Sequence, residues 1–385
     1  MDYVNNVKIM NICILASGYP TKKRSEAIFV AKLADEFAEL GHNVTFIAPQ
    51  SITNILYRDG VFSASSFVHK TRNGKCVNVY RPYTISFGNS FLGRKTNAFF
   101  RQFAIRQIVK KIDNIDVFYA HFWSQGHSLY KVIKDTKKPL FVATGESKIS
   151  YRNPKDGFAE YVSGVICVST KNKEESIRLG LTVGDKCVVL PNAIDNSVFY
   201  KKDKKECRVK LGIPQDSFVV ANGGTICHRK GQSRIAEAIN KLKDQGIYSF
   251  FLGRKENLDI SLDCPNIIHV GFVPHNVIPD YLNAADVYVF PSLAEGCSNS
   301  IVEAMSCGLP IISSDLPFNY DILDDKNSIL VDPQNIDQIA SAIAELKIDH
   351  QKLSAMSVDS LSKAESLTLP VRAQNIMKFI SSIIK

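Results

Sequence analysis

Short apolar runs rich in β-branched residues recur along the whole chain, separated by longer stretches of mixed polar and apolar residues. Such runs are typical of strands buried on both faces of a parallel sheet, with helices as the crossovers between them. The pattern therefore predicts an α/β fold in both halves of the chain. We expect strands at 7–15, 44–48, 77–80, 117–120, 140–143, 165–168 and 187–190, and then at 218–221, 248–252, 267–270, 287–290, 309–313 and 328–331.

The clearest helix lies at 29–40, where apolar residues recur at helical spacing before Gly41. Residues 200–208 (YKKDKKECR) form a charged run that we interpret as a solvated segment between the halves. A chain of 385 residues is long enough for two hydrophobic cores. We expect a first domain at 1–190, a second at 191–370, and a last helix at 371–385 that packs back on the first domain.

Composition is that of a globular protein, with 45% hydrophobic and 22% charged residues. The apolar run nearest the start is too short for a signal peptide or a membrane span, so we expect a cytoplasmic protein. The nine cysteines include no close C-x-x-C pair, which favours reduced core residues over disulfides or a zinc site.

The net charge of +9 is concentrated in the first half, above all in residues 51–150. Nucleic acid, an anionic membrane and an anionic substrate are all partners that such an excess could attract. Residues 91–112 place several cations among aromatic residues. Their apolar positions spread around a helical wheel, which predicts a partly buried helix.

The segment 291–310 (PSLAEGCSNSIVEAMSCGLP) follows a predicted strand, so its first loop lies where open α/β sheets bind ligands. The amino end of the helix expected at 301–307 favours a phosphate, and its free amides are those of Asn299, Ser300 and Ile301. Glu295 lies in the loop. Glu303 lies in the helix and has a second interpretation, since Ser300 and Glu303 have the spacing of a capping box. Glu295 has no such local role and is the stronger candidate for chemistry.

A second candidate is the segment 222–231 (NGGTICHRKG), which also follows a predicted strand. Glycines such as Gly224 let the backbone approach a ligand, and Arg229 and Lys230 supply cations for a diphosphate. The alternative is a solvated turn that carries two surface cations. The spacing excludes a Walker loop.

Two weaker candidates lie in the first half. Gly18 follows the first strand and precedes Lys22, Lys23 and Arg24, where a simple turn is the alternative. His121 ends the strand at 117–120, where the alternative is a histidine of the core.

These segments, in this order, resemble the family 4 glycosyltransferases, whose GT-B fold has two Rossmann-like domains facing each other across a cleft. The resemblance rests on residues 27–49, 164–199 and 271–312, the last with the E-x7-E pair Glu295 and Glu303. It implies that Glu303 binds the ribose of the nucleotide, Glu295 lies against the donor sugar, and Lys230 neutralises the departing diphosphate. It also implies donor contacts from Gly18, His121, Gly224, Thr225, Arg229, Ser298, Asn299 and Ser300.

The reaction implied is transfer of a sugar from a nucleotide sugar, with UDP expected, to a glycan or lipid-linked acceptor in polysaccharide synthesis. Retention of anomeric configuration and no essential metal or other cofactor are part of this expectation. The chain departs from the family pattern at Thr225, where an arginine is usual, so Arg229 is expected as a substitute cation. It also departs at Glu26 and Ala27, and at Thr144 and Gly145.

Two alternatives stay open from the sequence: a sugar-nucleotide 2-epimerase on the same fold, and a noncatalytic nucleotide-sugar-binding scaffold. We expect no nucleic-acid partner, because no reading motif accompanies the basic half. Instead we expect weak association of residues 51–150 with anionic membranes, which would place the protein at the inner face of the plasma membrane.

Overall fold

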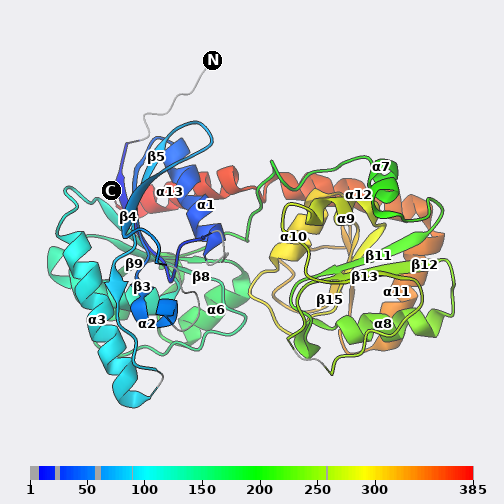
Figure 1. Cartoon of the computed structure of the whole chain (residues 1–385), viewed down its shortest axis with the longest axis horizontal. Coiled ribbons are helices and arrows are strands. Elements are labelled where there is room, and N and C mark those ends of the chain that lie inside the picture. Colours follow the sequence, from blue (N-terminus) through cyan, green and yellow to red (C-terminus); the bar gives the residue numbers. More distant parts are fainter. Residues whose placement is uncertain (1–7, 22–26, 57–61, 89, 257–258, 385) are drawn as a thin grey trace.

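The structure is a computed structural model that describes residues 8–21, 27–56, 62–88, 90–256 and 259–384. It has two lobes, each built on its own sheet (Figure 1). The N-terminal lobe holds an eight-stranded sheet in the order β10-β9-β8-β7-β1-β2-β5-β4. Its strands are β1 (Asn11–Leu15), β2 (Asn43–Ile47), β4 (Ser66–Lys70), β5 (Cys76–Tyr80), β7 (Val117–His121), β8 (Leu140–Thr144), β9 (Val162–Cys167) and β10 (Cys187–Val189).

The C-terminal lobe holds a six-stranded, fully parallel sheet in the order β13-β12-β11-β14-β15-β16. Its strands are β11 (Phe218–Gly223), β12 (Ile247–Leu252), β13 (Ile267–Gly271), β14 (Val287–Phe290), β15 (Ile311–Ser314) and β16 (Ser328–Val331). In both sheets the strand order reverses beside the first strand, at β1/β7 and at β11/β14. These are the switch points where doubly wound sheets bind ligands.

Every predicted apolar run contains a strand, although β1 is shorter than predicted and Val7 lies outside the described residues. The sequence did not reveal β4, which pairs antiparallel with β5 at the sheet edge. It also missed the short pair β3 (Gln50–Ser51) and β6 (Tyr83–Thr84). The residues of β4 are mostly exposed, so no buried apolar run marks this strand.

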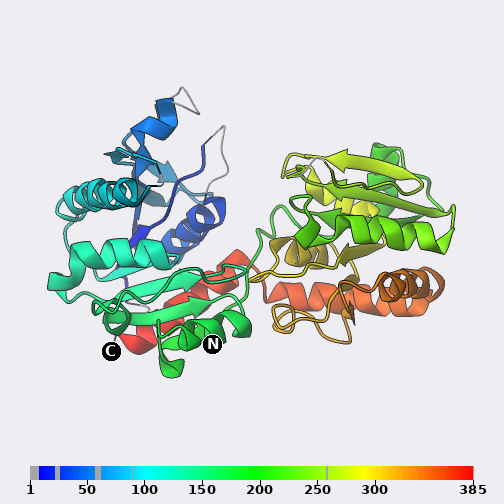
Figure 2. The same cartoon turned by 90° about the horizontal axis from the view of Figure 1, so that it is seen from below.

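Helices cover both faces of each sheet (Figure 2). Those of the N-terminal lobe are α1 (Ile28–Glu39), α2 (Ile52–Asn54), α3 (Phe91–Val109), α4 (Trp123–Ile133), α5 (Phe158–Tyr161) and α6 (Thr170–Arg178), with the 3₁₀ turns η2 (Lys134–Thr136) and η3 (Gly184–Lys186). Those of the C-terminal lobe are η4 (His228–Lys230), α7 (Lys204–Leu211), α8 (Gln232–Leu242), α9 (Ile278–Ala284), α10 (Asn299–Ser306), α11 (Ile336–Ile348) and α12 (His350–Glu365). The helix predicted at 29–40 is confirmed as α1, one residue earlier.

Alternate residues of the central strands enter opposite cores, as strands buried on both faces must. In β1, Ile12 and Ile14 enter the core beneath α1, whereas Cys13 and Leu15 enter the core that contains Trp123 of α4. The same alternation occurs in β11. This arrangement explains why strict polar–apolar alternation is absent from the strand sequences.

The last helix, α13 (Leu369–Ile383), belongs to the N-terminal lobe although α12 lies in the other (Figure 1). Its residues Ala373, Ile376, Met377 and Ile380 are buried in the core against α1 and β9. The chain thus crosses between the lobes twice, and the two crossings pair at Ile194, whose amide donates to Leu367 O and whose carbonyl accepts from Leu369 N, both at 2.9 Å.

The charged run at 200–208 is not the solvated segment that we predicted, because part of it is helical and Arg208 is buried. Asp203 caps α7, which begins inside the run, and Arg208 is only 4% exposed. The Arg208 guanidinium donates to Asp286 Oδ2 at 2.6 Å and to Ala284 O at 3.0 Å. A buried carboxylate 78 residues away therefore anchors this run to the C-terminal lobe.

Candidate active site

A cavity of about 1320 Å³ lies between the lobes, at the carboxyl ends of β7, β11 and β14. The N-terminal lobe lines it with Pro20, Thr21, Phe29, His121, Phe122 and Gly145, among others, and the C-terminal lobe with Gly224, Thr225, Lys230, Arg254, Glu295 and Glu303, among others. Pockets for one small ligand measure roughly 300–1000 Å³. The cavity is therefore larger than a usual site for one small ligand.

Most of the residues predicted for the site meet in this cavity. Those that line it are His121, Gly224, Thr225, Lys230, Glu295, Ser298, Asn299, Ser300 and Glu303. Gly18 is buried beside the cavity, where Pro20 and Thr21 supply the lining. The predicted cations Lys22, Lys23 and Arg24, and also Glu26, lie outside the described residues.

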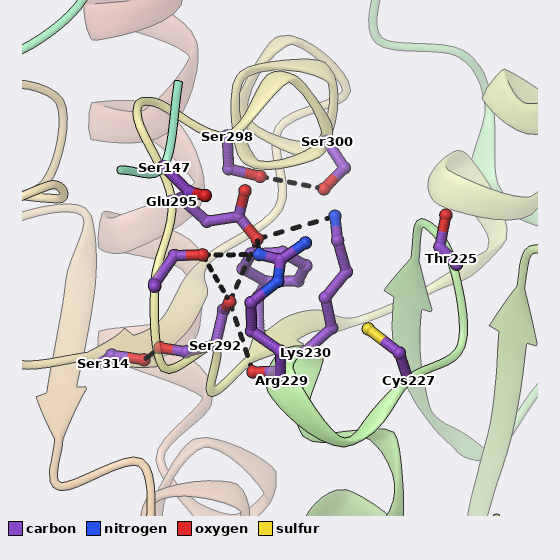
Figure 3. A network of polar contacts seen from close by, with 12 residues as sticks. Ser147, Thr225, Cys227, Arg229, Lys230, Ser292, Glu295, Ser298, Ser300 and Ser314 are labelled. Atoms are coloured by element: carbon purple, nitrogen blue, oxygen red, sulfur yellow. Dashed lines mark hydrogen bonds and ion pairs between the residues drawn. The ribbon is translucent and has the colours of Figure 1, made fainter. Parts of the chain in front are cut away.

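Glu295 is held by a group of polar contacts on the C-terminal lobe (Figure 3). Its Oε1 accepts from Arg229 Nη1 at 2.6 Å and from Ser292 Oγ at 3.0 Å, and it lies 3.6 Å from Lys230 Nζ. The carboxylate side chain is only 13% exposed. Two cations thus compensate its charge in a poorly hydrated position, as burial of a carboxylate requires.

The structure places Arg229 differently from the expectation that it replaces a diphosphate-binding arginine. Arg229 is not among the described residues that line the cavity. Its guanidinium also donates to Ala294 O at 2.5 Å, so it holds both the side chain and the backbone of the Glu295 loop. This arrangement makes Arg229 a positioning residue for Glu295.

Lys230 ends the 3₁₀ turn η4, and its ammonium lies 5.0 Å from the centre of the Phe290 ring. Gly224 lies directly against this side chain, with φ +111°, and a Cβ built there would be 2.8 Å from Lys230 Nζ. A side chain at position 224 would therefore displace the cation. Gly224 thus makes room for the Lys230 ammonium, which is a positive charge at the cavity wall.

Helix α10 begins at Asn299, two residues earlier than predicted, and Ser298 is its N-cap, accepting from Ile301 N at 3.4 Å. The alternative interpretation of Ser300 and Glu303 as a capping box is therefore wrong. Glu303 lies in the second turn, 3.3 Å from His275 Nε2, and lines the cavity. Because Ser298 is the N-cap, the carboxylate of Glu303 has no capping role in α10.

His121 ends β7 and packs against the rings of Phe29 and Phe122, with centroid distances of 6.5 and 4.2 Å. Its ring is partly open to the cavity but is otherwise surrounded by protein. Burial lowers its pKa to about 3, with a further contribution from the positive charge of Arg372. His121 is therefore a neutral imidazole at physiological pH, able to exchange hydrogen bonds without carrying charge.

Several cavity residues escaped the sequence analysis. Arg254 and Phe272 follow β12 and β13 and stack at 4.7 Å, and His275 comes three residues later. Their positions just beyond predicted strands are the same signal that marked Glu295. Tyr288 lies inside an apolar strand, so its sequence position predicts a core residue. Its hydroxyl, however, accepts a hydrogen bond from Gly223 N at 3.0 Å, and the residue lines the cavity.

In the part of the chain that the structure describes, no helix has the length and apolar character needed to cross a membrane.

Comparisons with known proteins identify the family of the chain. Residues 27–198 match the family model described as "Glycosyltransferase Family 4", and residues 217–349 match "Glycosyl transferases group 1". The Bacillus subtilis protein TuaC, named as a glycosyltransferase of teichuronic acid biosynthesis, is 24% identical over 89% of this chain and 90% of its own length. An Escherichia coli enzyme named UDP-Gal:α-D-GlcNAc-diphosphoundecaprenol α-1,3-galactosyltransferase is 28% identical over 58% of this chain and 60% of its own.

Solved structures show the same architecture. A sucrose-phosphate synthase from Thermosynechococcus elongatus superposes with a TM-score of 0.73 at 15% identity, covering 97% of this chain and 98% of its own. Anabaena HepE in complex with UDP and glucose superposes with a TM-score of 0.70 at 18% identity, covering 97% and 100%. Taken with the matching family models and the two facing Rossmann-like lobes, these similarities show that the chain is a glycosyltransferase enzyme that belongs to family 4 and has the GT-B fold.

Proposed function

We propose that this enzyme transfers a sugar, with retention of anomeric configuration, from a UDP-sugar to a glycan or lipid-linked acceptor in cell-surface polysaccharide synthesis. The observation that carries the proposal is the meeting of Glu295, Lys230 and Glu303 around the amino end of α10 in one interlobe cavity. The names of the relatives support the substrate classes, since the Escherichia coli enzyme is named for UDP-galactose and a diphosphoundecaprenol-linked acceptor.

Charge stabilisation is the chemistry that these residues can supply. Cleavage of the sugar–phosphate bond leaves negative charge on the diphosphate, and groups already oriented toward that charge lower the barrier. Lys230 and the amides at the start of α10 line the same cavity and are such groups. We propose that they do this work without an essential metal ion.

The two glutamates have different proposed roles. Glu303 lies beside His275 and would accept hydrogen bonds from ribose hydroxyls. Glu295 is oriented by Arg229 at the end of β14 and would face the transferred sugar. His121 would contact that sugar from the N-terminal lobe as a neutral hydrogen-bonding group.

Substitution of each glutamate by glutamine tests these roles. A thermal-shift screen of the wild type against nucleotide sugars first identifies the donor. Glu303→Gln should then weaken nucleotide binding by about tenfold, the equivalent of one charge-assisted hydrogen bond. Glu295→Gln should lower kcat by about 100-fold with nucleotide affinity retained. Glu365→Gln, an exposed glutamate of α12, is the control.

Equal loss of nucleotide binding in Glu295→Gln and Glu303→Gln would contradict the division of roles. Incubation with the UDP-sugar but without acceptor tests the epimerase alternative, because isomerised nucleotide sugar would refute transfer as the reaction. If Lys230→Ala and Glu295→Ala left the cellular glycan unchanged while deletion of the chain abolished it, the protein would be a scaffold.

We also propose that the enzyme is cytoplasmic and associates weakly with the anionic inner face of the plasma membrane through residues 51–150. The supporting observation is the outer face of α3, where Lys95, Phe99, Phe103, Arg106 and Lys110 are all exposed and recur at spacings of three or four. Phe99 and Phe103 are 64% and 54% exposed. Aromatic side chains flanked by cations suit an interface of apolar chains and anionic headgroups.

A further inference from the structure

The first turn of α6 connects the lobes at the loop that carries Glu295. Lys171 Nζ, from the N-terminal lobe, donates to Ser147 O at 2.5 Å and to Glu295 O at 3.1 Å. On either side of it, Thr170 donates from its amide and hydroxyl to the carboxylate of Asp321, at 2.8 and 2.7 Å. Asn172, fully buried, donates to Glu146 O at 2.9 Å. One helical turn thus contacts both lobes through three consecutive residues.

The backbones of the two lobes also approach closely beside Lys171, at Gly296 and Gly145. A Cβ built on Gly296 would lie 2.2 Å from Gly145 O and 3.1 Å from Glu146 O, so only glycine permits this approach. Figure 3 shows Ser147 beside Glu295, and Figure 1 shows α6 at the side of its lobe that faces the C-terminal lobe. The loop at 145–147 therefore forms a wall against which the Glu295 loop rests.

The side chain and the backbone of Glu295 are held from different lobes. Arg229, in the C-terminal lobe, binds its carboxylate, whereas Lys171, in the N-terminal lobe, binds its carbonyl. The Lys171 side chain is half-buried, and this burial lowers the pKa of its ammonium against the opposing effect of Glu175 and Glu295. A charged donor in such a position makes stronger hydrogen bonds than an exposed one.

We propose that Lys171 is a positioning residue that orients Glu295 for sugar transfer only when the two lobes are in contact. This inference rests on the proposed function of Glu295. It predicts that the catalytic arrangement is completed by lobe closure, and that Lys171 acts through the loop 294–297 without touching the substrate.

Lys171→Met tests the inference, because methionine keeps the length of the side chain and removes the charged donor. We expect kcat to fall by at least about tenfold, which corresponds to about 1.4 kcal/mol in activation free energy. Nucleotide affinity should stay within twofold of the wild type. Lys171→Arg should recover part of the loss. The matched control is Asp321→Ala, which removes an interlobe contact of the same turn that does not reach Glu295, and which should leave kcat within twofold.

Two measurements distinguish an effect of Lys171 on the orientation of Glu295 from a role in only holding the two lobes together. The double variant Lys171→Met/Glu295→Gln should be no slower than Glu295→Gln alone, because Lys171 acts through that residue. Hydrogen exchange of the amides at 295–297 should be faster in Lys171→Met than in the wild type. Equal losses of kcat in Lys171→Met and Asp321→Ala, or additive losses in the double variant, would overturn the proposal.

Failure of the proposed function gives a different result. If the wild type transferred no sugar, both the proposed glycosyl transfer and the proposed effect of Lys171 on kcat would be refuted. Hydrogen exchange would still report whether Lys171 holds the loop, and unchanged exchange in Lys171→Met would overturn the contact itself.

Discussion

At the scale of single residues, the environment decides what each carboxylate and imidazole can do. Glu295 and Glu303 are eight positions apart and similarly shielded, with side chains 13% and 15% exposed. One is compensated by Arg229 and Lys230, and the other lies beside the exposed ring of His275. The motif alone treats the two glutamates as a pair, whereas the structure gives them different charged neighbours.

His121 leads to a prediction about acid stability. Its pKa is about 3 in the folded chain, below the ordinary 6.5. Between pH 3 and pH 6.5 the unfolded chain therefore binds a proton on this histidine that the folded chain does not bind. The contribution of His121 to stability is complete above pH 6.5 and declines as the pH falls toward 3. At pH 5 the loss should be about 2 kcal/mol, since pH 5 lies about 1.5 pH units below the unfolded pKa and each unit is worth about 1.4 kcal/mol.

Urea unfolding of His121→Asn at pH 7 and pH 5 measures this effect. The variant should lose less stability between the two pH values than the wild type does. His350→Asn, which changes an exposed histidine at the start of α12, should behave as the wild type. The same pH dependence in all three proteins would contradict the buried, neutral state of His121.

At the scale of elements, helix boundaries and exposed faces depend on what surrounds each helix. Ser298 and Ser300 are both good N-cap residues, and in the folded chain Ser298 takes this position. On α3, apolar residues spread around the helix, but Ala104 and Ile105 are buried while Phe99 and Phe103 are exposed. The expected partly buried helix is confirmed, and the structure shows which side faces outward.

The exposed face of α3 predicts reversible attachment to anionic vesicles. The double variant Phe99→Ser/Phe103→Ser should reduce binding at least about tenfold, because burying one such side chain contributes roughly 1.5–3 kcal/mol. Flotation with phosphatidylglycerol vesicles at low and high salt measures this, and high salt should weaken wild-type binding by screening Lys95, Arg106 and Lys110.

Val209→Ser/Ile348→Ser is the matched control, since both residues are highly exposed apolar side chains of the C-terminal lobe. No binding of the wild type at low salt would refute the membrane contact. Equal loss of binding in the two double variants would show that the face of α3 is not the site of attachment.

At the scale of the whole molecule, the order of elements along the chain does not follow the division into lobes. The chain leaves the N-terminal lobe after β10, builds the C-terminal lobe, and returns with α13. Arg372 of α13 is 3% exposed and donates to the carbonyls of Leu190 and Pro191 at the first crossing. The returning helix therefore fixes both the core of the N-terminal lobe and the connection between the lobes.

Ile376 tests this contribution of α13. Ile376→Ala should destabilise the N-terminal lobe by about 2–4 kcal/mol, the usual cost of a cavity left by a fully buried side chain. Trp123 is the only tryptophan of the chain and is fully buried in that lobe, so its fluorescence reports the transition. Val358→Ala, at a 61% exposed position of α12, is the control. An unchanged tryptophan transition in Ile376→Ala would contradict the role of α13.

The sequence by itself determined the buried strands, the α/β class, the family and several residues of the cavity. These features depend on local patterns, since burial on both faces produces continuous apolar runs, and ligand-binding residues follow directly at the ends of parallel strands. Lys230, Glu295 and His121 were all found by that rule. The edge strand β4 was missed because exposure leaves no such run.

Only the tertiary structure decided which groups face one another. Arg229 and Glu295 are 66 positions apart, and Lys171 and Glu295 are 124 positions apart. No local pattern could show that Arg229 contacts the carboxylate of Glu295, or that Ser298 and not Ser300 is the N-cap of α10. The energies of these contacts depend on distance and burial between segments that meet only when the two lobes have folded and come together.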